Sequence, residues 1–257
     1  MPEIAEVEIV RRGLERVKGQ TLLSFQAGPK LKAHGHEDEI VGRKLEGVLR
    51  RGKLLGFDFG DRILLAHLRM TGRFHFEQSP RARAQMRFEE TSLAFIDPRG
   101  FATMEVINSG RWPMGLGPDL WDAISDPGWL PTESYRKSRR SIKASILDQK
   151  VVAGIGNYLA DESLWRAAVA PERKTSDVSE KEWRDILESA GRLSLLVLQS
   201  GGVTIRDYAD TEGQSGSGQA RLLVYGRAGE ECLRCGGRLQ KGRFAGRGTT
   251  WCQSCQV

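Results

Sequence analysis

The chain has 257 residues, 39% of them hydrophobic, which is enough for one large packed domain or two smaller ones. No apolar run reaches the roughly 18 residues that span a bilayer, and the acidic N-terminus is unlike a secretory signal, so we expect a cytoplasmic protein. The net charge of +6 points only weakly to a polyanionic partner, because many ordinary proteins carry such a surplus.

The first half of the chain combines one helix with a β-rich region. Residues 3–18 are expected to be helical, because apolar residues recur there at three- and four-residue steps. From about residue 20 to 107, short apolar or alternating runs are separated by Gly, Asp and Pro, which is typical of antiparallel sheets in a sandwich or barrel. The clearest of these runs are Leu45–Arg50, Lys53–Phe59, Arg62–Leu68 and Leu93–Ile96.

The second half follows a Gly-, Pro- and Trp-rich stretch at 108–134 and is helical in pattern. Ile142–Val151 and Tyr158–Trp165 flank a Gly-x-Gly-Asn turn, residues 179–199 give the clearest helix, and the composition of 212–219 is that of a flexible loop. We therefore expect an α+β multidomain protein. Its parts would be an N-terminal domain at 1–118, a linker at 119–133, a helical domain at 134–224 and a metal-binding module at 225–257.

All four cysteines lie in the last 26 residues, as two close pairs: Cys232-x2-Cys235 and Cys252-x2-Cys255. A disulfide-bonded protein would spread its cysteines along the chain to close loops. Two such pairs instead supply four thiolates for tetrahedral zinc, with a rubredoxin-like iron site as the chemical competitor. Because four cysteines close the coordination shell, we expect one structural Zn²⁺ rather than a catalytic one.

Positive charge is concentrated in two places. Residues 221–257 hold seven Lys or Arg and two Glu, and residues 136–143 hold five Lys or Arg. Between the cysteine pairs, basic residues alternate with glycines, so a hairpin there could insert them into a DNA groove. Each cluster alone also fits a solvated surface, and the metal module fits a protein contact. Together they suggest a track for nucleic-acid phosphates.

The N-terminus offers an unusual nucleophile. Methionine aminopeptidase normally removes Met before a small residue, which would leave Pro2 as a secondary amine. An α-amino group has a pKa far below that of a lysine, and the positive end of a helix lowers it further, so a free-base fraction could attack a sugar C1′. Glu3 lies beside it as a proton donor and acceptor. Taken alone, the two residues are better explained as an ordinary helix start.

Pro2-Glu3-x-x-Glu6-Val7-Glu8, the closing metal module and several motifs between them resemble the formamidopyrimidine-DNA glycosylase/endonuclease VIII family. The landmarks follow the family order from Pro2 to Gln256. The resemblance implies an N-terminal antiparallel β-sandwich with flanking helices, a C-terminal helix–two-turn–helix domain and a four-cysteine zinc finger. It makes Pro2 the nucleophile and Glu3 the acid/base.

Further site residues follow from the same resemblance. Lys53 in Arg50-Arg51-Gly52-Lys53 matches a lysine that contacts phosphate near the reaction centre, and Arg247 matches the zinc-hairpin arginine that grips the phosphates flanking the flipped nucleotide. Extruding a base leaves an unstacked hole and an orphaned partner. The residues matching those that fill this hole are Met70, Arg99 and Phe101, of which Met70 and Phe101 could otherwise be core positions. Two matched DNA-binding positions remain, Lys143 near the lesion pocket and Asn157 at the turn.

Three departures from the family pattern bear on the site. Ile4-Ala5 stands where Leu-Pro or Gly-Pro is usual, which could change how Pro2 is aimed. Tyr158-Leu159 replaces Ile-Tyr after the turn asparagine, and Gly100 replaces a basic or bulky residue. None of them removes a group that does covalent chemistry.

The function implied is a bifunctional DNA glycosylase/AP lyase that excises oxidised purines from double-stranded DNA. It would act as a cytoplasmic monomer that reaches the bacterial nucleoid through DNA. The complete trio favours the formamidopyrimidine branch of the family. An endonuclease VIII-like enzyme for oxidised pyrimidines and a catalytically silent damaged-DNA-binding paralogue stay open.

Overall fold

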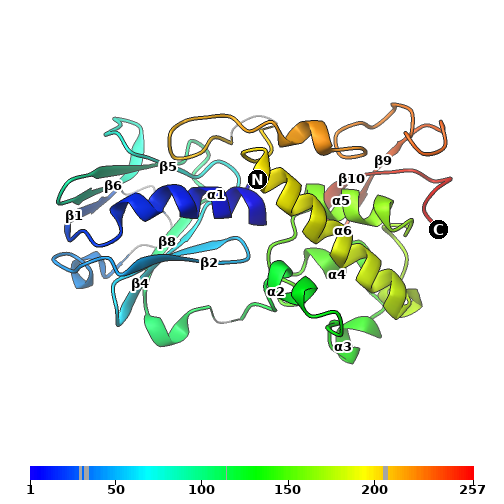
Figure 1. Cartoon of the computed structure of the whole chain (residues 1–257), viewed down its shortest axis with the longest axis horizontal. Helices are drawn as coiled ribbons and strands as arrows, with labels where there is room; N and C mark the ends of the chain where they lie inside the picture. The colour runs from blue at the N-terminus through cyan, green and yellow to red at the C-terminus, as the bar shows by residue number, and fades with distance from the viewer. Residues whose placement is uncertain (29–30, 32–34, 114, 205–207) are drawn as a thin grey trace. The chain divides into compact units, whose positions relative to one another are not determined.

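The computed structural model describes residues 1–28, 31, 35–113, 115–204 and 208–257 (Figure 1). The chain forms two compact units. The first comprises Met1–Met114 and Leu198–Gln219, and the second comprises Gly115–Val197 and Ala220–Val257. The division is discontinuous, whereas the domains expected from the sequence are continuous segments.

The first unit is built from two antiparallel four-stranded sheets, which confirms the expected sandwich. One sheet has the order β1-β6-β7-β5 and the other has the order β2-β3-β4-β8. The strands are β1 (Leu22–Ala27), β2 (Gly47–Arg51), β3 (Leu54–Asp58), β4 (Arg62–His67), β5 (Arg73–His75), β6 (Ala82–Phe88), β7 (Ser92–Ile96) and β8 (Thr103–Asn108).

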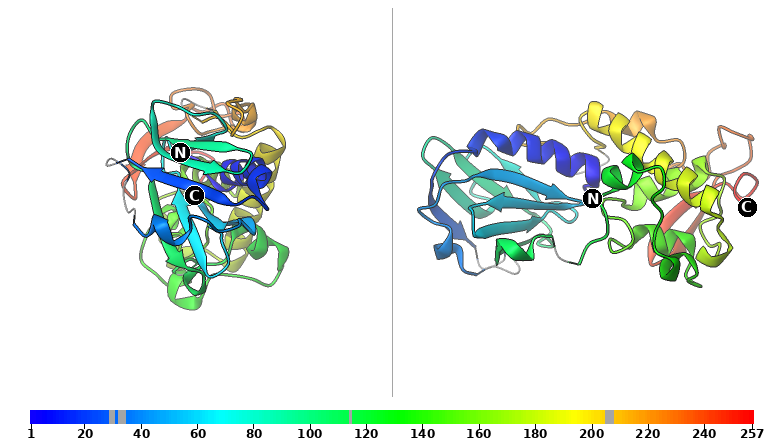
Figure 2. Two further views of the ribbon diagram at one scale, coloured as in Figure 1. Left: turned by 90° about the vertical axis from the view of Figure 1, so that its left-hand side faces the viewer. Right: turned by 60° about the horizontal axis from the view of Figure 1, so that its bottom comes forward.

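The core of this unit fills the space between the sheets. Phe57 on β3 lies edge-on to Phe74 on β5, with ring centroids 5.3 Å apart, so the contact joins the two sheets. Helix α1 (Ile4–Leu14) packs alongside the sandwich and contributes Val7, Val10 and Leu14 to the same core (Figures 1 and 2). The hydrophobic stripe recognised in the sequence is therefore the face by which α1 is held.

The second unit contains helices and a terminal hairpin, in agreement with the expected helical domain and zinc module. Within the stretch expected as linker, α2 forms and packs on α6. Gly191 on α6 makes room for it, since a Cβ there would lie 2.3 Å from Cδ1 of Ile124. The elements are α2 (Leu120–Ser125), α3 (Glu133–Arg136), α4 (Ile142–Leu147), α5 (Asn157–Arg166), α6 (Glu180–Gln199), β9 (Gln240–Phe244) and β10 (Arg247–Trp251).

Short 3-10 turns complete the assignment: η1 (Glu15–Val17), η2 (Glu37–Glu39), η3 (Ser109–Arg111), η4 (Thr175–Asp177) and η5 (Gly218–Arg221). Among the described residues, no helix combines the length and apolarity that a membrane crossing requires.

Candidate active site and metal centre

The start of α1 is enclosed and fixed by Glu6. Pro2 is buried and Glu3, the N-cap residue, is 2% exposed. One oxygen of the buried Glu6 carboxylate accepts a hydrogen bond from the Glu3 backbone N–H at 2.8 Å, and the other accepts one from the Val203 N–H at 2.9 Å. The role of Glu6 was not predicted from the sequence, where the residue appeared only as part of the N-terminal motif. A glutamate three residues after an N-cap is typical of a capping box, and this spacing could have indicated the role.

Lys53 lies in the two-residue loop that joins β2 to β3. Arg51 pairs with Leu54 across the hairpin, which leaves Gly52 and Lys53 as the loop. Gly52 has a φ of +55°, which such tight turns require and which glycine adopts without strain. Lys53 is 7% exposed.

His67 ends β4 near this loop and was not selected from the sequence. Burial, followed by the charges of Arg69 and Lys53, lowers its pKa to about 3, so the ring is neutral at pH 7. Its Nδ1 accepts a hydrogen bond from the Arg69 N–H at 3.1 Å, which places the ring proton on Nε2. His67 therefore adds a neutral N–H donor next to the loop that carries Lys53.

The expected hole-filling residues are on the surface. Met70 is 40% exposed and Phe101 is 44% exposed. Neither side chain is therefore part of the hydrophobic core, which was the alternative interpretation of these two residues. The Arg99 guanidinium lies 5.0 Å from the centroid of the Phe101 ring, a cation–π distance. An apolar and aromatic surface with an arginine on it is suited to stacking against bases.

Asp97 and Thr71 join the segments that carry this trio. The buried Asp97 carboxylate accepts hydrogen bonds from the Thr71 hydroxyl and from the Ala102 N–H, the latter at 2.8 Å. The Thr71 oxygen in turn accepts one from the Arg99 N–H at 3.4 Å. Gly100, between Arg99 and Phe101, has a φ of +65°. Glycine adopts this conformation without strain, so its presence in place of the family's basic or bulky residue suits the local backbone.

Lys143 is enclosed by polar partners within the second unit. The side chain is 0% exposed, and its Nζ donates to Asp161 Oδ1 at 2.5 Å, to Thr249 Oγ1 at 2.6 Å and to the Gly248 carbonyl. Lys143 thereby joins α4 and α5 to β10. Its expected contact with DNA near the lesion pocket stays a prediction.

Asn157 and Arg247 lie near that internal ion pair. Asn157 begins α5, and its Nδ2 donates to the Gly248 carbonyl at 2.9 Å, next to Arg247 in the chain. Arg247 is exposed at the start of β10. It follows a two-residue turn in which Ala245 and Gly246 both have positive φ, at 51° and 70°, as in a tight hairpin. The hairpin therefore presents Arg247 at its tip.

The basic cluster at 136–143 is largely neutralised within the protein. Arg136 pairs with Glu180, Lys137 with Glu133 and Arg140 with Asp148, while Lys143 is buried against Asp161. This cluster is therefore a weaker phosphate track than its charge count suggests.

The four cysteines form a metal centre. Their Sγ atoms all lie within 4.8 Å of one another, and none is in a disulfide. Tetrahedral zinc with Zn–S bonds of about 2.3 Å separates its sulfurs by roughly 3.8 Å. The separations Cys232–Cys255 and Cys235–Cys252 are 3.9 and 3.5 Å, so the residues fit one structural zinc with a closed shell.

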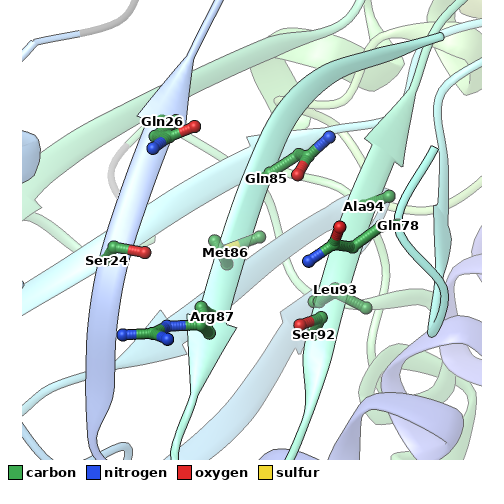
Figure 3. Close-up of a pocket in the computed structure, with 9 residues that line it drawn as sticks. All are labelled: Ser24, Gln26, Gln78, Gln85, Met86, Arg87, Ser92, Leu93 and Ala94. Carbon is green, nitrogen blue, oxygen red and sulfur yellow. The ribbon is translucent and has the colours of Figure 1, made fainter. Parts of the chain in front are cut away.

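A separate hollow of about 350 Å³ lies on the β1-β6-β7 face (Figure 3). Its lining is mostly neutral and polar, with Arg87 as the charged side chain, and does not overlap the candidate residues. The lining residues are Ser24, Gln26, Gln78, Gln85, Met86, Arg87, Ser92, Leu93 and Ala94.

Comparison with known families matches three successive parts of the chain. Residues 1–104 match the formamidopyrimidine-DNA glycosylase N-terminal domain, residues 120–208 its H2TH domain, and residues 229–257 the zinc finger found in FPG and IleRS. The chain is 38% identical over 273 residues to the formamidopyrimidine-DNA glycosylase of Lactococcus lactis subsp. cremoris, covering 100% of this chain and 99% of that protein. The chain belongs to the formamidopyrimidine-DNA glycosylase family.

Other relatives agree with this assignment. The formamidopyrimidine-DNA glycosylase of Listeria monocytogenes serotype 4b is 39% identical over 274 residues, with 100% of both chains covered. MutM (Fpg) from Thermus thermophilus is 34% identical, with a TM-score of 0.89 over 99% of this chain and 98% of that one. A Lactococcus lactis Fpg mutant in complex with Fapy-dG-containing DNA is 35% identical, with a TM-score of 0.86 over 99% of both chains.

Proposed function

We propose that this formamidopyrimidine-DNA glycosylase family member is a bifunctional glycosylase/AP lyase that removes 8-oxoguanine and formamidopyrimidine lesions from double-stranded DNA. The observation that carries the proposal is the enclosed Pro2-Glu3 start of α1, held by Glu6. The solved Lactococcus lactis relatives bound to Fapy-dG-containing DNA and to abasic-site DNA support the substrate class.

Pro2 is proposed as the nucleophile once Met1 has been removed, because its nitrogen is otherwise part of an amide. The positive end of α1 favours the neutral form of the resulting secondary amine. Its lone pair attacks C1′, the bond from C1′ to the base breaks, and the base leaves with a proton. Glu3 supplies a proton to the sugar-ring oxygen as the ring opens, which leaves an iminium ion between Pro2 and C1′.

The iminium then makes strand cleavage possible. It acidifies the C2′ hydrogen, so loss of that proton expels the 3′-phosphate by β-elimination. A second elimination expels the 5′-phosphate, and water hydrolyses the imine to release the sugar fragment and restore Pro2. Glu3 is the proposed proton acceptor in these steps.

The remaining candidates hold the DNA. Lys53 and, in the second unit, Asn157 and Arg247 are proposed phosphate contacts. Met70, Arg99 and Phe101 are proposed to fill the space left by the extruded nucleotide, with Arg99 donating to the orphaned base. Zinc bound by the four cysteines stabilises the hairpin that carries Arg247 and takes no part in the chemistry. We propose that the protein acts as a cytoplasmic monomer on nucleoid DNA.

Borohydride trapping tests the nucleophile. A duplex carrying 8-oxoguanine is incubated with the protein and borohydride, and the intact mass of the protein is measured in parallel. We expect a covalent adduct on protein that lacks Met1, and no adduct after Pro2 is blocked by a retained N-terminal extension. Protein that lacks Met1 and still gives no adduct would overturn the assignment. Excision from duplexes with oxidised pyrimidines, run side by side, distinguishes the endonuclease VIII-like alternative.

A further inference from the structure

Glu8 is a buried carboxylate on α1 that the proposed reaction does not use. It is 7% exposed and contacts three guanidinium groups: Arg11 at 2.9 and 3.0 Å, Arg12 at 2.9 Å and Arg50 at 3.1 Å. Burial raises the pKa of Glu8, but the hydrogen bonds from Arg11 and Arg12, together with the charges of Arg11 and Arg50, outweigh that effect and hold the pKa below its usual range. The carboxylate is therefore ionised at pH 7.

Arg50 differs from the other two arginines in where it comes from. Arg11 and Arg12 lie on the same helix as Glu8, whereas Arg50 lies on β2 and its side chain is only 9% exposed. Its Nε donates to Glu8, and its NH1 donates to the Gly52 carbonyl at 3.2 Å. One guanidinium thus bonds both to the helix that follows the proposed nucleophile and to the loop that carries Lys53.

The Gly52 carbonyl is an effective point at which to hold this loop. It belongs to the same planar peptide group as the Lys53 N–H, so fixing its direction fixes the plane from which Lys53 begins. Gly52 is the residue with positive φ in the turn and has the widest choice of backbone conformations. A hydrogen bond at this place therefore removes the freedom that would otherwise let Lys53 swing.

We propose that the Glu8–Arg50 pair is a positioning device that holds Lys53 in register with the start of α1. The pair does not touch DNA, and its effect reaches the phosphate through Lys53. The inference rests on the proposed role of Lys53 as a phosphate contact. It does not require Pro2 to be the nucleophile.

Arg50→Gln is the suitable variant, because Glu8 keeps Arg11 and Arg12 and is not left as an unpaired buried charge. Arg12→Gln is the matched control. It removes a guanidinium from the same carboxylate, but the Arg12 side chain is 61% exposed and its bond to Glu8 stays within α1. Thermal unfolding of each variant reports its stability separately.

The decisive measurement is the salt dependence of affinity for a duplex containing a tetrahydrofuran abasic analogue, from roughly 50 to 200 mM salt. Losing one phosphate contact reduces the slope of log K against log salt by about 0.9. We expect that reduction for Lys53→Gln and for Arg50→Gln, no further reduction for the double variant, and the wild-type slope for Arg12→Gln. We also expect trapping by Arg50→Gln to be about tenfold slower, a 1.4 kcal/mol effect on the barrier.

Several outcomes would overturn the inference. A wild-type slope for Arg50→Gln means that Lys53 still contacts its phosphate without the Glu8–Arg50 pair, whatever the variant's thermal stability. Additive losses in the double variant mean that Arg50 contacts a phosphate itself. An unchanged slope for Lys53→Gln removes the contact on which the device would act. Absence of any covalent adduct with the wild type, beside the expected slopes, would instead reject the proposed nucleophile and leave the positioning role standing.

Discussion

The carboxylate of Glu6 accepts a hydrogen bond from the backbone N–H of Val203, 197 positions further along the chain. The same carboxylate accepts from the N-cap residue of α1, which directly follows the proposed nucleophile Pro2. A segment from the far end of the sequence is thereby attached directly to the start of α1.

Replacing Glu6 by Gln should destabilise the first unit and slow trapping. The carboxylate accepts from two backbone N–H groups with its two oxygens, and an amide has only one oxygen to offer. One buried N–H then faces an NH₂ group, at a cost of about 1–3 kcal/mol. Chemical denaturation and single-turnover trapping measure the two effects. Wild-type values in both would show that Glu6 is not needed to hold this region.

His67 should make the folded state sensitive to mild acid. Its pKa in the folded protein is about 3, below the usual value of 6.5, so below about pH 6.5 the unfolded chain binds a proton that the folded chain does not. The free energy of unfolding should therefore fall as the pH drops from about 6.5 towards 3, by at most ~1.4 kcal/mol per pH unit from this group. Urea titrations at pH 7 and pH 5 should show a smaller difference for His67→Gln than for the wild type. Equal differences would place the ring in contact with solvent.

Lys143→Met should lower the free energy of unfolding of the second unit by about 3–5 kcal/mol, because it leaves the Asp161 carboxylate buried without its cationic partner. The double variant Lys143→Met with Asp161→Leu should recover much of that loss, since no charge remains to be buried. Calorimetry of the wild type, both single variants and the double variant completes the cycle. If Lys143→Met left the stability unchanged but reduced the slope of log K for DNA binding against log salt, the result would support the direct DNA contact expected from the sequence.

Met70→Ala and Phe101→Ala should affect base extrusion more than fold stability. Both side chains are exposed, so we expect stability to change by less than about 0.5 kcal/mol. Base stacking is worth about 1–3 kcal/mol, which corresponds to a roughly 5- to 150-fold slower excision of an intact lesion. Cleavage at a preformed abasic site, where no base has to be extruded, serves as the internal control and should change less. Equal losses on both substrates would indicate a general defect.

Removal of the metal should release the terminal hairpin. We expect one zinc per chain by elemental analysis, and loss of DNA binding when a chelator removes it or when Cys252 is changed to Ser. Arg247→Gln is the control, since it should weaken binding while the protein retains its zinc. If the metal-free protein bound the abasic analogue as tightly as the wild type, the zinc finger would not be needed for DNA affinity.

The sequence predicted those features that depend on local pattern. The helical stripe of α6 and the spacing of the cysteines are properties of neighbouring residues, and both predictions are confirmed. Strand β6 was harder, because Arg and Gln alternate with its buried Ala84, Met86 and Phe88 and a bulge interrupts its pairing with β7. The alternation itself is typical of a half-buried strand, so a signal for β6 was present in the sequence.

The fate of Lys143 was beyond local pattern altogether. Its partners Asp161 and Thr249 lie 18 and 106 positions away, so nothing near residue 143 indicates that the ammonium is buried. The Glu8–Arg50 contact, 42 positions apart, was missed for the same reason.

The return of residues 198–219 to the first unit sets an order of events during synthesis. Val203 leaves the ribosome long after α1. The hydrogen bond between Val203 and Glu6 can therefore form only after most of the chain has been synthesised. Throughout that interval the Glu6 carboxylate lacks one of its two backbone partners, so the start of α1 is held less firmly. The peptidase proposed to trim Met1 therefore meets a loose end on the nascent chain, and the finished fold then encloses the proline it leaves behind.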